Sequence, residues 1–129
     1  MIENLIQNLT AISLGMMFFF SFIIAPVIFR VLDTKNAGKF VRTIFPYYYF
    51  VNLLILSVVI FLFIYRSSIS LDFYITFIIA ILFLFLILIL MPLINKFKDS
   101  NEGKKFKYAH GLSVFINFIQ MIGLVYLII

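Results

Sequence analysis

The chain has 129 residues, of which 65% are hydrophobic and 12% are charged, and its mean hydropathy is +1.21. Soluble domains are about 45–50% apolar, so this composition excludes an ordinary soluble domain and predicts one membrane domain over residues 1–129. The net charge of +5 comes from Lys and Arg between apolar runs, so it requires no nucleic-acid partner. Because there is no cysteine, disulfides, thiolate metal sites and a cysteine nucleophile are excluded.

The first predicted membrane helix covers residues 4–31. Its uncharged core, residues 9–29, is long enough to cross about 30 Å of hydrocarbon. No Lys or Arg precedes the apolar run, so we expect no cleavable signal peptide and a retained first helix. Pro26 removes a backbone donor and should kink this helix near its charged end.

Along one side of this helix there are two pairs of small residues, and the members of each pair are four residues apart. Such pairs let a neighbouring helix approach closely. We therefore predict close helix packing at these four positions. They are Ala11, Gly15, Ser21 and Ala25.

The loop that follows the first helix predicts a short amphipathic helix at the membrane interface. Its apolar residues recur at i, i+3, i+4, i+7 and i+8, opposite Lys35, Lys39 and Arg42, and Asp33 or Thr34 could cap it. A helix that docks a lipid head group or a partner would show the same pattern. The apolar stripe consists of Ala37, Phe40, Val41, Ile44 and Phe45.

The second membrane helix is predicted over residues 46–65, because Pro46 is favoured in the first turn of a helix. Asn52 and Ser57 are the only polar residues in its core. Three consecutive tyrosines near its start predict an aromatic belt at head-group level, with a stacking platform for a ligand as the alternative. These are Tyr47, Tyr48 and Tyr49.

The third membrane helix, residues 71–94, is the most hydrophobic. Between Phe73 and Leu90, Thr76 and the Tyr74 hydroxyl are its only polar side-chain groups, so we expect it to be the helix most exposed to lipid. Pro92 and Asn95 are predicted to end it.

The fourth membrane helix, residues 108–129, carries a polar seam. Four polar residues spaced by three, four and three fall within roughly an 80° sector of one helical face. Because polar groups facing hydrocarbon are expensive, we expect this seam to face the other helices or water. The seam residues are His110, Ser113, Asn117 and Gln120, and the candidate partners are Asn52, Ser57, Ser13 and Ser21.

The basic residues predict the orientation in the membrane. Nine of the ten Lys and Arg lie in the first and third loops, and only Arg66 lies in the second. The positive-inside rule then places both termini in the periplasm of a bacterial inner membrane, with anionic lipids attracted to the cytoplasmic face. The nine are Arg30, Lys35, Lys39, Arg42, Lys96, Lys98, Lys104, Lys105 and Lys107.

Several segments form an ordered pattern along most of the chain. They are GMMFFFSF at 15–22, APVIF at 25–29, AG at 37–38, FPYY at 45–48, PLIN at 92–95, and HGLS at 110–113 with Asn117. This pattern resembles the transmembrane protein 205-like family of four-helix membrane proteins. The resemblance implies a bacterial protein of largely unknown function, although a eukaryotic relative is associated with platinum-drug resistance and vesicle traffic.

The four-helix architecture with a histidine in the last helix is also similar to the copper-resistance protein D and membrane protoporphyrinogen-oxidase families. These work with copper and haem, at sites that need more histidines than this chain has. As a haem ligand, His110 would need a second axial ligand from a methionine or from His110 of another protomer. Capping, helix contact, proton relay or partner contact are the other roles for this histidine. The candidate methionines are Met16, Met17, Met91 and Met121.

The acids lie in loops or near the ends of the predicted helices, which argues against an exporter built on a membrane-embedded carboxylate. No acid is placed to orient His110, and no phosphate loop or metal-ligand set occurs, so we predict no enzyme and no metal site. The acids are Glu3, Asp33, Asp72, Asp99 and Glu102.

We therefore predict a small non-catalytic inner-membrane protein that acts as an accessory or scaffold subunit of a larger membrane complex. Its partners would be other membrane subunits or further copies of itself. Two alternatives stay open. One is a haem- or copper-handling protein that uses His110, and the other is a homo-oligomeric carrier for a hydrophobic or cationic solute.

Overall fold

The computed structural model describes residues 1–129, and all of its regular structure is helical. Consecutive segments join into four long helices, each long and apolar enough to cross a membrane, which confirms the predicted number of membrane helices. The segments are α1 (Ile2–Phe19), the π-helix η1 (Phe20–Ile24), α2 (Ala25–Val31), α3 (Thr34–Tyr65), α4 (Leu71–Phe85), the π-helix η2 (Leu86–Leu90), α5 (Met91–Asp99) and α6 (Gly103–Ile128).

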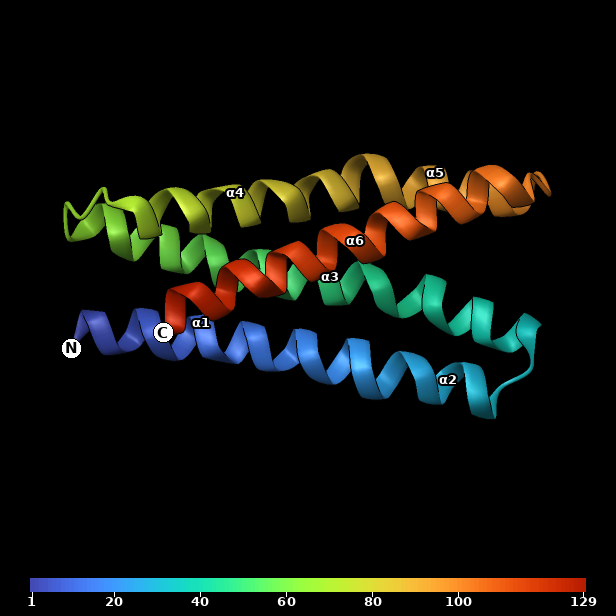
Figure 1. Cartoon of the computed structure of the whole chain (residues 1–129), viewed down its shortest axis with the longest axis horizontal. Coiled ribbons are helices and arrows are strands. Elements are labelled where there is room, and N and C mark those ends of the chain that lie inside the picture. The colour runs from blue at the N-terminus through green and yellow to red at the C-terminus, as the bar shows by residue number, and fades with distance from the viewer.

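The four helices run alternately up and down, with both termini at one end (Figure 1). We call this the terminal end, and the end that carries the α2–α3 and α5–α6 connections the basic end. Toward the terminal end α1 packs against α3 and α6, and α4 packs against α3 and α6. At the basic end α2 contacts α3 but has no extensive contact with α5 or α6. The bundle is therefore closed at one end and splayed at the other.

Pro26 and Pro92 each follow a π-helical segment and lie in the first turn of the next α-helix. A proline cannot bond the carbonyl of the preceding turn, and a wide π turn relieves the clash of its ring with that turn. The prediction that Pro92 and Asn95 end the third helix is wrong, since α5 continues to Asp99. A proline in a first turn is compatible with further helix.

The predicted separate amphipathic helix is not present. Residues 34–45 form the first three turns of α3, and Pro46, which was predicted to start the second helix, lies inside it. Asp33 caps α3 by accepting a hydrogen bond from the backbone N–H of Asn36 at 2.9 Å. The fourth helix also starts before the predicted Tyr108, at Gly103.

The tyrosine cluster belongs mostly to the core. Tyr48 and Tyr49 are only 7% and 5% exposed, so the predicted aromatic belt is wrong for both, and Tyr47 alone of the three faces outward. The ring of Tyr48 stacks on Phe20 with centroids 4.2 Å apart, and Tyr49 packs against Phe83. Burial of large aromatic surface outweighs their preference for the interface because the hydroxyl of Tyr48 has a partner inside the bundle.

Close helix packing occurs at a glycine that the small-residue pattern did not identify. Ala11 and Gly15 are exposed, and a Cβ on Gly15 would meet nothing within 4 Å, so the prediction of close packing there is wrong. A Cβ on Gly123 would instead lie 2.8 Å from Cδ1 of Ile79, so α4 approaches α6 closely at Gly123. The rotation of α1 is set by its larger buried side chains, such as Met17.

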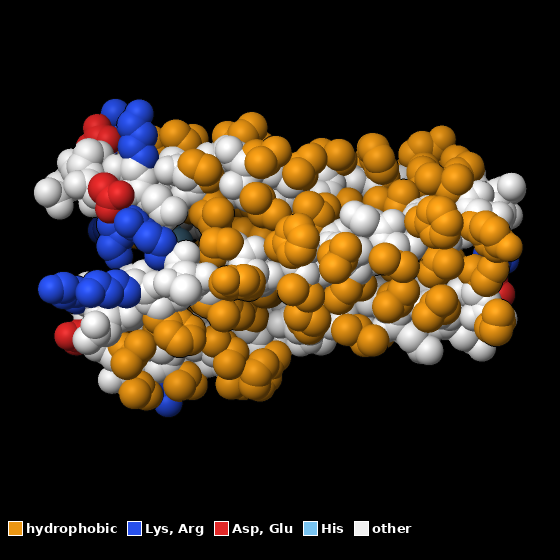
Figure 2. All heavy atoms as spheres, turned by 180° about the vertical axis from the view of Figure 1, so that it is seen from behind, with side chains coloured by type: hydrophobic (Ala, Val, Ile, Leu, Met, Phe, Trp, Pro, Cys, Tyr) orange, Lys and Arg blue, Asp and Glu red, His pale blue; other side chains and the backbone are white.

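Figure 2 shows a broad hydrophobic surface with Lys and Arg gathered at the basic end. Arg66, in the α3–α4 connection, lies at the terminal end and forms an ion pair with Glu3 at 3.2 Å. This separation of charge along the bundle is the pattern expected of a multi-pass membrane protein.

Candidate functional site

Asn117 of α6 joins three helices near the middle of the bundle. Its amide Oδ1 accepts a hydrogen bond from the Tyr48 hydroxyl of α3 at 2.7 Å. Its Nδ2 donates to the hydroxyl oxygen of Ser21 in η1 at 2.9 Å. Both polar atoms of the amide are thus used in contacts between helices, as the seam hypothesis requires.

Asn52 is tied to α1, not to the seam on α6. The Ser13 hydroxyl donates to Asn52 Oδ1 at 2.7 Å, and Asn52 Nδ2 donates to the backbone carbonyl of Tyr48 at 2.8 Å. Of the other candidate partners, Ser21 binds the seam residue Asn117, whereas Ser57 is exposed and bonds only the carbonyl of Leu53 in its own helix.

The other three seam residues do not share a hydrogen-bond partner. Gln120 is fully buried and donates from Nε2 to the carbonyl of Ile79 in α4 at 3.2 Å, while its Oε1 has no partner. The hydroxyl of Ser113 donates to the carbonyl of His110 at 2.6 Å. The imidazole of His110 is exposed and stacks on Phe106, with ring centroids 5.8 Å apart.

The splayed end of the bundle contains two adjoining cavities of about 170 and 320 Å³, which we call the cleft. The smaller cavity reaches down to Ser21, Tyr48 and Asn117, and the larger one reaches up to Gly38 and Lys98. Both are lined by six common residues. These are Phe29, Val41, Phe45, Tyr49, His110 and Ser113.

The cleft is apolar inside and open at its side. Phe29 on α2 and Val114 on α6 are 59% and 55% exposed, so the edges of the cleft are accessible from the lateral surface of the bundle. Phe45 and Tyr49 on α3 line the same cavity. An apolar chain could therefore enter the cleft from the hydrocarbon without crossing a polar surface.

A third cavity, of about 430 Å³, lies at the basic end, and we call it the basic mouth. It shares Gly38, Arg42 and Lys98 with the cleft, so the two are continuous. Its lining consists of Thr34, Lys35, Gly38, Lys39, Arg42, Lys98 and Asp99.

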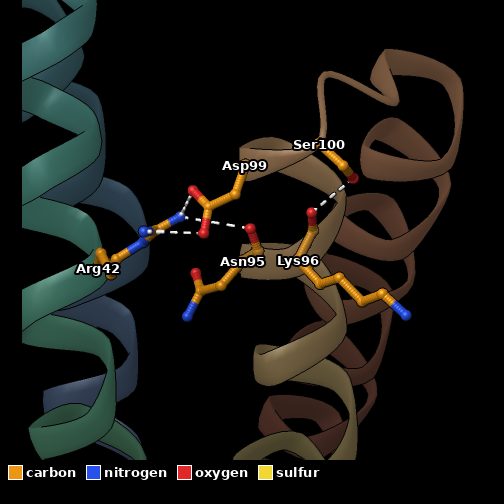
Figure 3. Close-up of polar contacts among 5 residues, drawn as sticks. All are labelled: Arg42, Asn95, Lys96, Asp99 and Ser100. Atoms are coloured by element: carbon orange, nitrogen blue, oxygen red, sulfur yellow. Dashed lines mark hydrogen bonds and ion pairs between the residues drawn. The ribbon is translucent and has the colours of Figure 1, made fainter.

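Arg42 spans the basic mouth from α3 to α5 (Figure 3). Its guanidinium donates to Asp99 at 2.8 and 3.4 Å and to the backbone carbonyl of Asn95 at 3.4 Å. The side chain of Lys96 points away from this group in the same view. Arg42, which was predicted only as an interface residue, thus ties two helices together, whereas Arg30 at the end of α2 makes no ion pair.

Lys98 is held across the mouth without an acidic partner. Its ammonium nitrogen lies 2.9 Å from where a Cβ of residue 38 would be, so any larger residue at that position would displace the end of the lysine. It also lies 5.5 Å from the centroid of the Phe106 ring, which is a favourable cation–π distance. The nearby carboxylate of Glu102 pairs instead with Lys105 at 3.2 Å, and hydrogen bonds from Lys105 and Ser100 hold its pKa below the usual value.

Comparison with known proteins identifies the family of this chain. Residues 9–103 match the model described as "Domain of unknown function (DUF4149)". The chain belongs to this family. It is 33% identical over 115 residues to an "Uncharacterized protein" of Aquifex aeolicus (strain VF5), an alignment that covers 89% of this chain and 85% of that protein. No solved structure matches the chain.

The match to the DUF4149 model covers the basic mouth and α3 in full, and it ends where α6 begins. The seam residues of α6 thus lie outside the matched residues.

A metal site is not apparent in this DUF4149 protein, because no three His, Cys, Asp or Glu side chains are grouped. Of the methionines proposed as a second haem ligand, Met91 lines the larger cavity together with His110. Met16, Met17 and Met121 do not line the cleft. Gly38 and Lys98 were not predicted as site residues, since nothing in the local sequence pattern relates two positions on different helices.

Proposed function

We propose that this protein is a non-catalytic accessory protein of the bacterial inner membrane that holds one largely apolar, amphipathic molecule in the cleft. The observation that supports the proposal is the form of the cleft, which is apolar inside, open sideways and continuous with a polar mouth. Binding sites for small apolar ligands have this combination of a concave apolar lining and a few polar groups.

The orientation follows from the charge distribution. The basic end would face the cytoplasm and both termini the periplasm, because short loops rich in Lys and Arg stay on the cytoplasmic side. The cleft would then open into the cytoplasmic leaflet. The resemblance to the transmembrane protein 205-like family adds no activity to this proposal.

The polar groups of the bundle core favour holding over catalysis. Ser13, Asn52, Tyr48 and Asn117 bond one another or the backbone, so none is left to activate a substrate. The same contacts close the lower end of the cleft at Ser21, which favours a holding protein over a carrier with a path through the membrane. An accessory subunit that presents its ligand to a larger complex fits this arrangement.

The test is native mass spectrometry of protein extracted from its own membrane in mild detergent. Val41→Trp should fill the cleft, because Val41 lines both cavities. Val58→Trp is the matched control, since Val58 lies on the same helix and faces outward. We expect a small added mass on the wild type and on the control, and none on Val41→Trp. Absence of added mass from the wild type, or its retention in Val41→Trp, would overturn the proposal.

The second candidate is haem binding, favoured by one observation. His110 and Met91 line the same cavity, and histidine with methionine is an established axial pair. An optical spectrum of the protein expressed with haem supplied should then show a Soret band that both His110→Ala and Met91→Leu abolish. A spectrum without that band would remove this candidate.

A further inference from the structure

The basic mouth carries an excess of positive charge. Four of its residues are cationic, and Asp99 is the one acid that lines it. Asp99 is already paired with Arg42, and the neighbouring Asp33 uses its carboxylate to cap α3. The cations without a paired acid are Lys35, Lys39 and Lys98.

Lys98 is the cation that lies directly above the cleft. It lines both the basic mouth and the larger cavity, and its ammonium lies close to Gly38 and to the ring of Phe106. An ammonium placed in this way, without a carboxylate, is suited to bind an anion that enters the mouth.

The depth of the cleft matches one leaflet of a bilayer. Gly38 at its upper end and Tyr48 at its lower end are both on α3, and at about 1.5 Å per residue they are about 15 Å apart along the helix. The hydrocarbon core of a bilayer is about 30 Å thick, so one leaflet contributes about 15 Å. A single acyl chain lying parallel to α3 would therefore reach from the mouth to the Tyr48–Asn117 contact.

We propose that the occupant of the cleft is an anionic membrane lipid, with its phosphate at Lys98 in the basic mouth and one acyl chain in the cleft. This inference rests on the proposed function and adds the chemical class of the ligand. The lateral opening between Phe29 and Val114 admits the chain from the membrane. The mouth lies at the basic end, and Figure 2 shows that the hydrophobic surface gives way to Lys and Arg at this end, which is the level expected for lipid head groups.

A lipid fits the structure better than a free anion. A free phosphate would use only the basic mouth and would leave the aromatic lining of the cleft without a ligand. A zwitterionic lipid would fill the cleft but would bring a cation to a mouth that already has four cationic residues. The anionic lipid is the one occupant that matches both parts.

The experiment titrates delipidated protein in detergent with phosphatidylglycerol or phosphatidylcholine of identical chains, and with inorganic phosphate, read by native mass spectrometry. We expect the wild type to prefer phosphatidylglycerol. Lys98→Gln should weaken phosphatidylglycerol binding about tenfold, as expected for loss of a charged hydrogen-bond donor. It should weaken phosphatidylcholine binding less, because the choline cation of that lipid already opposes the contact of its phosphate with the basic mouth. Lys96→Gln is the matched control, because it removes the same charge two residues away on α5, which at about 100° per residue is nearly the opposite side of the helix, and Lys96 points away from Arg42 (Figure 3).

The possible results of this titration distinguish the class of the lipid, the role of Lys98 and binding of a free anion. Equal binding of the two lipids by the wild type, both abolished by Val41→Trp, would overturn the anionic class and keep the proposed function. Equal weakening in Lys98→Gln and Lys96→Gln would assign the effect to net charge and also overturn the inference. Displacement of phosphatidylglycerol by millimolar phosphate would assign the mouth to a free anion. Binding of neither lipid would overturn this inference, whereas the proposed function is decided by the mass found on protein extracted from its own membrane.

Discussion

Two cavities of about 320 Å³ lie at opposite ends of this bundle, and they differ in chemistry. The one at the terminal end is mostly polar, and its two acids and one base include the ion pair of Glu3 with Arg66. The one at the basic end is half apolar and continues into a mouth with four cationic residues and one acid. Equal volume therefore does not mean an equal site. Charge imbalance combined with an apolar interior is what distinguishes the cleft.

The difference arises from how the helices separate. At the terminal end α1 remains packed against α3 and α6, so its cavity is confined to short polar segments at the helix ends. Toward the basic end the π segment η1 precedes α2, and α2 then lacks extensive contact with α6. A π turn changes the direction in which the following residues point, which is one reason such segments occur at functional sites.

The largest expected effect comes from removing the Asn117 contacts, which lie between the closed terminal end of the bundle and the cleft. Asn117→Leu removes two hydrogen bonds between helices, one with Tyr48 and one with Ser21. At about 0.6–2 kcal/mol for each such bond, we expect a loss of about 1–4 kcal/mol in folding free energy, measured by unfolding in detergent. Membrane insertion should be unaffected, because leucine inserts readily. Phe118→Leu, at an exposed position, is the control, and equal stability of the two variants would contradict the role of Asn117.

A smaller loss of folding stability is expected when a methyl group is added inside the closed terminal end of the bundle. Gly123→Ala places a methyl group 2.8 Å from the end of the Ile79 side chain, which must then move. Overpacking of this kind costs about 1–3 kcal/mol, and the buried position of Ile79 leaves it little room. Gly15→Ala, where the space is open, should be neutral or slightly stabilising. The melting temperatures of the two variants measure the difference, and a larger loss at Gly15 would show that this outward face is covered in the assembled protein.

The charge difference between the two ends can be increased. Asp99→Asn removes the one acid of the basic mouth and leaves the Arg42 guanidinium without its ion pair. We expect binding of phosphatidylglycerol to become about threefold to tenfold tighter, in line with roughly 1 kcal/mol per charge near a lipid head group. Glu3→Gln makes the same change of charge at the terminal end and should have no effect. Weaker binding in Asp99→Asn would mean that the Arg42–Asp99 pair serves to hold the mouth in shape.

The smallest expected effect tests the position of a single ammonium group. Gly38→Ala should displace Lys98 by a few tenths of an ångström or more, since a Cβ there would lie 2.9 Å from its nitrogen. Because the end of a lysine is flexible, the cost to folding should be negligible, and binding of phosphatidylglycerol should weaken only about twofold to threefold. Combining Gly38→Ala with Lys98→Gln should add no further loss. An additive loss would show that residue 38 acts on the lipid by another route.

Hydropathy and charge along the sequence were enough to predict the four membrane helices and the separation of nine basic residues from the tenth. These properties are local, because each helix satisfies its own backbone hydrogen bonds and each needs about 20 apolar residues. Of the predicted polar seam, Asn117 and Gln120 bond neighbouring helices as expected. Ser113 bonds only the carbonyl of His110 in its own helix, and His110 is exposed. Proline was the least reliable boundary signal. Pro46 and Pro92 lie within continuous helix because neighbouring turns adapt to the missing donor.

By itself, the sequence determined that this is an all-helical membrane protein with most of its positive charge at one end, because composition and spacing decide insertion. Only the tertiary structure decided that Tyr48 and Tyr49 lie inside, that Gly123 and not Gly15 permits close packing, and that Gly38 and Lys98 meet at the mouth of a cleft. The physical reason is that helix rotation and contacts between distant residues depend on the sum of all side-chain packing. The periodicity of one helix shows which residues share a face but not which neighbour that face meets.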